Sequence, residues 1–212
     1  MAEDKIYGMT LNDFIAVAAS NSHTPGGGNV SAVVATLAAS MVAMVGNLTV
    51  SNKKYADFHA QASVQVDKLM GIIAKLKDLT NNDIAAFDHY MACYKLPKDT
   101  DEQKAAKAAA LEDAAKKATL VPLEICQCCL EIIAEAEELS KYGNKMAISD
   151  VGVGAMVGEA AMRACMLSVD INLPTIKDQD FVAKVKAQRE HLFVLAEELK
   201  LLGLARVKEK MS

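Results

Sequence analysis

Residues 24–52 read TPGGGNVSAVVATLAASMVAMVGNLTVSN and contain no charged side chain. The stretch is long enough to cross a bilayer, whose hydrocarbon core is about 30 Å thick. Much of its apolar content is alanine, however, which drives membrane insertion weakly, and serine, threonine and asparagine occur throughout. We therefore predict no membrane span but a helix over 29–52 that is buried on all sides at the centre of a helical bundle.

The composition of the whole chain supports a helical fold. Its 212 residues fit one domain, 1–212, and the 52% hydrophobic content is ample for a core. Aromatic residues make up only 5%, whereas strands are enriched in aromatic and β-branched residues. No segment shows the strict alternation of a half-buried strand. The predicted fold class is an all-α, antiparallel up-and-down bundle with long helices at 10–20, 29–52, 54–94, 102–118, 122–141, 149–170 and 178–210.

The ends of these helices carry recognisable signals. Pro122 is expected to start or kink a helix, and Gly143 to provide a left-handed cap at its C-terminus. Polar N-caps are expected at Thr10, at Asp99 or Thr100, and at Ser149 or Asp150.

Charge and cysteine usage narrow the functional class. The 23 Lys and Arg against 27 Asp and Glu give a net charge of −4, so the chain lacks the basic footprint of a nucleic-acid-binding protein. Five cysteines, without a paired zinc or redox spacing, predict buried thiols in a reducing compartment. Residues 1–5 lack the basic start of a secretory signal, so a cytoplasmic location is expected. The four histidines are scattered, and no metal site is predicted.

Two motifs in the first half of the chain could carry chemistry. Pro25 and the three glycines Gly26–Gly28 precede a helix N-terminus, where bare backbone can contact an anion or a planar ligand. The alternative is a simple tight turn. Asp83 and Phe87 lie four residues apart and share a helix face, which would place an acid or base beside a stacking surface for a planar cation. The alternative is a solvated helix surface.

Two further motifs have stronger structural explanations. Ser149 and Asp150 could cap a helix, while Gly152 and Gly154 would allow close helix contact. Lys53 and Lys54 suit the C-terminal dipole of the uncharged helix, and could also meet an anionic substrate tail.

Taken in order, six segments of the chain resemble the C-terminal family of formiminotransferase-cyclodeaminase. They are TPGGGN (24–29), MVGNLT (44–49), KKY (53–55), DIAAF (83–87), LP (96–97) and SDVG (149–152). The segments LPKDTDE (96–102) and VPLEIC (121–126) are most similar to the cyclohydrolases of that family.

The resemblance implies an all-helical homodimer that binds a folate derivative and needs no further cofactor. The implied reaction is hydrolysis of 5,10-methenyltetrahydrofolate to 10-formyltetrahydrofolate, with Asp83 as proton shuttle and Asp150 as its alternative or orienting partner. Two alternatives stay open: a formimidoyltetrahydrofolate cyclodeaminase that releases ammonia, and a non-catalytic helical scaffold. The implied substrate-binding residues are Pro25, Gly26, Gly27, Gly28, Asn29, Asn47, Lys53, Lys54, Phe87, Ser149 and Gly152.

Overall fold

The computed structural model describes residues 6–212, and no strand occurs within that range. Residues 1–5, on which the expectation about a secretory signal rests, lie outside the described residues. Short 3₁₀ helices lie in three of the connections between α-helices, at Lys53–Phe58, Lys145–Ala147 and Leu173–Thr175. The α-helices are α1 (Leu11–Ala18), α2 (Gly27–Val50), α3 (His59–Tyr94), α4 (Asp101–Leu139), α5 (Ile148–Asp170) and α6 (Gln179–Met211).

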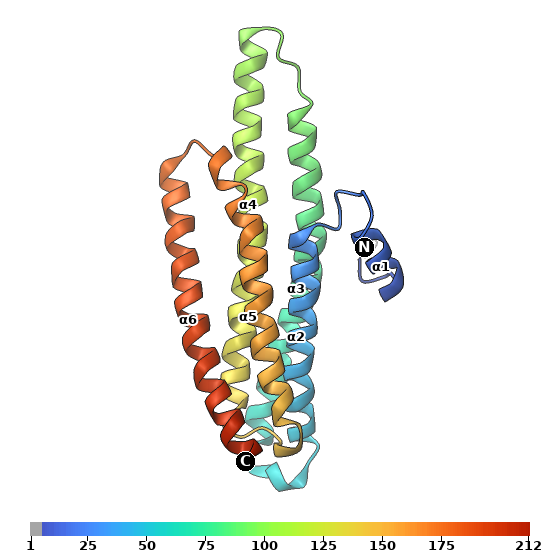
Figure 1. Ribbon diagram of the computed structural model, residues 1–212, viewed down its shortest axis with the longest axis vertical. Coiled ribbons are helices and arrows are strands. Elements are labelled where there is room, and N and C mark those ends of the chain that lie inside the picture. The colour runs from blue at the N-terminus through green and yellow to red at the C-terminus, as the bar shows by residue number, and fades with distance from the viewer. Residues whose placement is uncertain (1–5) are drawn as a thin grey trace.

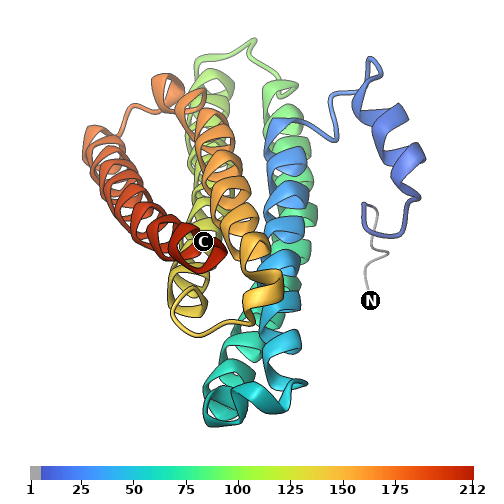
Figure 2. The ribbon, with the colours of Figure 1, turned by 60° about the horizontal axis from the view of Figure 1, so that its bottom comes forward.

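The long helices pack side by side as an antiparallel bundle, as predicted (Figure 1). Helix α2 packs against α3 and α5, α4 completes the central group, and α6 covers α4 and α5. Helices α3 and α4 extend furthest, to the connection at 95–100 (Figure 1). Helix α1 projects away from the bundle in both views and buries none of its residues (Figure 2).

The uncharged stretch forms α2, whose small residues admit close neighbours. A Cβ atom on Gly154 of α5 would overlap Val42 Cγ2 and lie 3.1 Å from the carbonyl oxygen of Ala38. Burial on all sides was wrong, because α2 keeps an outer face on which Leu37 is 58% exposed. By length and composition alone 27–50 and 145–175 could each span a bilayer, and half of the apolar window in each is buried inside the bundle.

Helix α4 differs from the two separate helices predicted for this region. It runs unbroken for 39 residues with Pro122 in its interior. Proline lacks the N–H that would bond to the carbonyl four residues earlier, which normally interrupts a helix. Here the carbonyl oxygen of Ala118 instead accepts a hydrogen bond from Asn172 Nδ2 at 3.0 Å. A residue of another segment thus supplies the missing donor.

The predicted caps divide into two groups. Thr10 and Thr100 cap α1 and α4, since their side-chain oxygens accept hydrogen bonds from the backbone N–H three residues on. The prediction for Ser149 or Asp150 was wrong: Asn144 caps a preceding 3₁₀ turn, so α5 starts earlier. The prediction that Gly143 forms a left-handed cap was also wrong, because no residue of 6–212 has a positive φ. Gly143 is instead required by close packing, since a Cβ there would lie 2.7 Å from the carbonyl oxygen of Leu139.

Candidate active site

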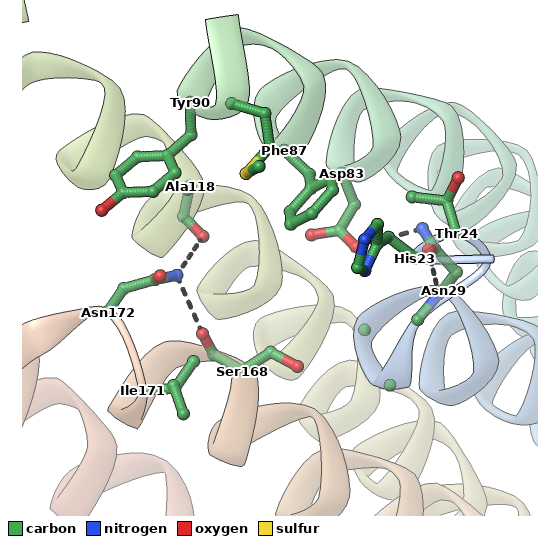
Figure 3. A pocket seen from close by; sticks show the side chains of 14 residues that line it. His23, Thr24, Asn29, Asp83, Phe87, Tyr90, Ala118, Ser168, Ile171 and Asn172 are labelled. Carbon is green, nitrogen blue, oxygen red and sulfur yellow. Dashed lines mark hydrogen bonds between the residues drawn. The ribbon is translucent and has the colours of Figure 1, made fainter. Parts of the chain in front are cut away.

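A cavity of about 330 Å³ lies where the start of α2 meets α3, α4 and the end of α5. Its walls combine bare backbone, one carboxylate, aromatic rings and polar side chains (Figure 3). The lining residues are His23, Thr24, Gly26, Gly27, Gly28, Asn29, Asp83, Phe87, Tyr90, Met91, Ala118, Ser168, Ile171 and Asn172.

The glycine motif is the N-terminus of α2. Gly26 is the N-cap, so Gly27, Gly28 and Asn29 belong to the first turn of the helix and not to a preceding loop. The N–H of Gly26 donates to Asn29 Oδ1 at 2.8 Å, an arrangement that uses the Asn29 side chain to close the turn. Pro25, just before the cap, is buried.

Gly28 allows α2 to approach the carboxylate of Asp83 on α3. A Cβ atom at position 28 would lie 2.7 Å from Asp83 Oδ2, which is closer than van der Waals contact permits. At Gly27 the nearest atom to a Cβ would be Ser168 Oγ at 3.8 Å, an ordinary contact. Of these two glycines, it is therefore Gly28 that the approach to Asp83 requires.

Asn29 connects the glycine turn to Asp83. Its side chain is only 1% exposed, and its Nδ2 donates to Asp83 Oδ2 at 3.0 Å and to the carbonyl oxygen of Thr80 at 3.1 Å. With Oδ1 bound to Gly26, every polar atom of this side chain has a partner. Asn29 therefore holds one oxygen of Asp83 in place and acts as a positioning residue.

The carboxyl group of Asp83 is a weaker acid than an ordinary aspartate. Burial in the cavity wall raises the pKa of Asp83 from 3.8 to about 6, because the charged form loses hydration there. A carboxyl group with such a pKa exists in both protonation states near neutral pH. It can therefore accept a proton and return it, which general acid–base catalysis requires.

Phe87 follows Asp83 by one helical turn and lines the same cavity, as the sequence spacing predicted. The ring of His23 approaches it, with 6.1 Å between centroids and a tilt of 42°. His23 belongs to the segment before α2 and lines the same cavity as Asp83 (Figure 3). The aromatic pair could hold a planar ligand close to the acid.

The remaining predicted site residues lie elsewhere in this chain. Lys53 follows α2, whose 24 residues correspond to about 36 Å, so it lies at the opposite end of the bundle. Lys54 and Ser149 line a different cavity there, of about 520 Å³. Asp150 is in the first turn of α5, at that same end.

Two other predicted residues are also separate from the cavity with Asp83. Gly152 is buried against α6, where a Cβ would lie 3.3 Å from Leu204 Cδ2, so its role here is close packing. Asn47 is exposed on the outer side of α2 and lines a shallow apolar hollow between α2 and α3. Within a single chain, Gly26–Asn29, Asp83 and Phe87 therefore line one cavity, and the other predicted residues do not line it.

Several lining residues were not predicted from the sequence, among them His23, Tyr90, Ser168 and Asn172. Tyr90 follows Phe87 by three residues on α3, and this helical spacing was a usable signal. Ser168 and Asn172 come from the end of α5, more than 80 residues from Asp83 in sequence, and no local pattern pointed to them.

Comparisons with known proteins identify relatives of nearly the whole chain. A family model described as formiminotransferase-cyclodeaminase matches residues 10–191. The methenyltetrahydrofolate cyclohydrolase of Methylorubrum extorquens is 37% identical over 96% of this chain and 98% of its own length. The formimidoyltransferase-cyclodeaminase of Sus scrofa is 30% identical over 99% of this chain, which covers 39% of that longer protein.

A solved structure also has this fold. The crystal structure of formiminotetrahydrofolate cyclodeaminase from Thermotoga maritima matches with a TM-score of 0.85 and 28% identity, covering 97% of both chains. The family match spans most of the helical bundle and includes both the glycine turn and Asp83. The chain therefore belongs to the formiminotransferase-cyclodeaminase family.

Proposed function

We propose that the chain hydrolyses 5,10-methenyltetrahydrofolate to 10-formyltetrahydrofolate, with Asp83 as proton shuttle. The observation that carries the proposal is the carboxyl group of Asp83, held by Asn29 in a cavity beside Phe87, with its pKa raised to about 6. The similarity to the Methylorubrum cyclohydrolase over nearly the full length of both chains supports this choice of reaction.

The reaction removes both protons of the attacking water and returns one to the leaving nitrogen, so it releases one proton. The methenyl carbon lies between two nitrogens and shares a positive charge with them. Water attacks this carbon while the Asp83 carboxylate takes a proton from the water, and a neutral tetrahedral intermediate forms. The bond to the pteridine-ring nitrogen then breaks as Asp83 returns its proton to that nitrogen. The hydroxyl group of the intermediate gives up its own proton to solvent as the formyl C=O bond forms, so one proton is released overall.

Electrostatic attraction alone would not accelerate this step. Hydration removes the positive charge of the substrate, so a carboxylate stabilises the bound cation more than it stabilises the intermediate. Asp83 must therefore contribute by proton transfer and by positioning the water. The Asn29 hydrogen bond to Oδ2 suits this role, since it fixes the direction of the carboxyl group.

The test is spectroscopic. The methenyl compound absorbs in the near ultraviolet, and the purified protein should bleach this band faster than buffer, with 10-formyltetrahydrofolate as product. Failure to accelerate the loss of the band over the spontaneous reaction would reject the hydrolase.

The second candidate function is the cyclodeaminase reaction, in which a folate nitrogen attacks a formimino carbon and ammonia leaves. The similarity to the Thermotoga and Sus scrofa proteins favours it, and both reactions pass through a tetrahedral carbon bonded to folate nitrogens. Growth of the near-ultraviolet band from the formimino substrate, with release of ammonia, would identify this activity.

We also propose that the protein is a homodimer. The outer faces of the adjacent helices α2 and α5 expose apolar side chains such as Leu37, Met156 and Leu167, and α1 exposes Leu11 without burying any residue. Sedimentation of the purified protein should give twice the chain mass, and Leu37→Glu with Met156→Glu should shift it to the monomer. A monomer in the unaltered protein would reject the proposal.

A further inference from the structure

Asn172 occupies an unusual position on the wall of the cavity opposite Asp83. It follows the C-terminus of α5, and its Nδ2 donates to two carbonyl oxygens, those of Ala118 and Ser168, both at 3.0 Å (Figure 3). Each carbonyl lacks its usual helical partner. Pro122 has no N–H to offer Ala118, and Ser168 is among the last residues of α5, whose carbonyls have no partner within the helix.

These two bonds determine how the amide is oriented. An asparagine side chain has two N–H donors and one carbonyl acceptor. Rotating the amide by half a turn would place its oxygen against two carbonyl oxygens and leave both without a donor. Both donors of Asn172 are thus occupied by main chain, and only Oδ1 remains for a ligand.

The free oxygen can accept but not donate a hydrogen bond. Among the described residues, Asn172 Oδ1 has no hydrogen-bond partner, and it is not among the buried unsatisfied atoms, so it is accessible. Asn172 lines the cavity together with Asp83, Phe87 and Tyr90. A ligand in this cavity therefore lies between the Asp83 carboxyl group and an amide side chain whose donors are already used.

We propose that Asn172 is a specificity-determining residue whose Oδ1 binds an N–H donor on the amino-substituted edge of the substrate's heterocycle, and that Pro122 sets its orientation. The inference rests on the proposed function for the identity of the ring. A pterin carries such donors at its 2-amino group and at N3. A site built around a hydrogen bond to N–H rejects analogues that lack the donor.

The test measures binding of ligands that cannot react. The probes are a 2-amino-4-oxoquinazoline analogue of folate, its 2-desamino counterpart and its N3-methyl counterpart, each titrated calorimetrically. The unaltered protein should bind the parent compound about tenfold more tightly than at least one counterpart, the size expected of one hydrogen bond. In Asn172→Ala that ratio should fall below about twofold.

Two further variants keep the result interpretable if Asn172→Ala is unstable. Pro122→Ala restores an N–H that competes for the Ala118 carbonyl, so the amide is held less firmly and the ratio should fall to an intermediate value. Pro97→Ala, in the exposed connection between α3 and α4, should leave the ratio unchanged. Equal ratios in the unaltered protein and in both Asn172→Ala and Pro122→Ala would overturn the proposal, as would equal weakening of all three ligands in Asn172→Ala.

The outcome is separable from that of the reaction assay. Loss of discrimination in the Asn172 variant would support the acceptor role even if the protein failed to bleach the methenyl band. Normal hydrolysis with unchanged discrimination would overturn the acceptor role and leave the hydrolase proposal standing. If none of the three probes binds the unaltered protein, the inference about Asn172 is wrong.

Discussion

The two ends of the bundle each contain a cavity beside a helix N-terminus, but their chemistry differs. At the start of α2 the cavity holds a partly buried carboxyl group that a buried asparagine positions. At the start of α5 the cavity is lined by Lys54, Lys145 and Lys210. Lys54 and Lys145 are exposed, and their charges remain hydrated and screened. Burial, and not the presence of a charged residue in a motif, separates a candidate catalytic group from a solvated one.

The largest expected effect separates the two acids. Asp83→Asn removes the proton shuttle and should lower kcat by at least about a hundredfold, the usual lower scale of acid–base catalysis. Asp150→Asn, at the other end of the chain's bundle, should change kcat less than twofold. Steady-state rates of both variants check this difference. Near-normal turnover of Asp83→Asn would remove Asp83 from the mechanism, and a large loss in Asp150→Asn would show that the two ends cooperate.

The next effect concerns the close approach at the glycine turn. Gly28→Ala places a Cβ atom against Asp83 Oδ2, so the carboxyl group must move and lose its bond from Asn29. We expect kcat to fall about tenfold or more while the melting temperature changes little, since a small displacement of a catalytic group is costly for the rate.

Gly71→Ala is the matched control for this substitution. Gly71 is also helical, but a Cβ there has no atom within 4 Å. This variant should keep full activity and be slightly more stable, because alanine favours helix over glycine by about 0.5–1 kcal/mol. Equal activity of Gly28→Ala and Gly71→Ala would contradict the assigned role of Gly28.

The raised pKa of Asp83 predicts a pH dependence of both rate and stability. The first step needs the carboxylate, so kcat/KM, corrected for spontaneous hydrolysis, should rise with pH and level off above about 6. The folded state binds this proton more tightly than the unfolded state. The resulting stability is full below the ordinary pKa of 3.8 and is lost as the pH rises through about 6.

The same linkage gives a second measurement. Asp83→Asn has no charge to bury, so its melting temperature relative to the unaltered protein should be higher at pH 7.5 than at pH 4. Scanning calorimetry of the two proteins at both pH values checks this sign. An unchanged difference would show that the environment of Asp83 does not raise its pKa.

The smallest expected effect is at the cationic end. Lys53→Glu with Lys54→Glu should change the KM for a monoglutamate substrate less than twofold. These lysines follow the far end of α2, a helix about 36 Å long whose first turn lies beside Asp83. Repeating the measurement with a polyglutamate substrate extends the test. A KM that rises for the polyglutamate alone would indicate that a long anionic tail reaches these lysines.

Local features were predictable because their causes lie within a few residues. The uncharged stretch and the helical spacing of apolar residues indicated an all-α bundle, and Thr10 and Thr100 cap helices through their own backbone neighbours. Asp83 and Phe87 share a helix face and line one cavity, as one turn of helix requires.

Contacts between distant segments were decided only by the tertiary structure. The continuity of α4 through Pro122 depends on Asn172, which lies 50 residues later in the chain. The need for glycine at position 28 arises from a carboxyl group on another helix. The order of the motifs could not show that Lys53 and Ser149 lie far from Asp83. The two ends of a long helix such as α2 are far apart in space even though the motifs at its ends are close in sequence. By itself the sequence determined the all-α class, the caps at Thr10 and Thr100 and the candidate acid, since periodicity and these caps are local. Packing determined where α4 ends, which residues surround that acid and how burial changes its pKa.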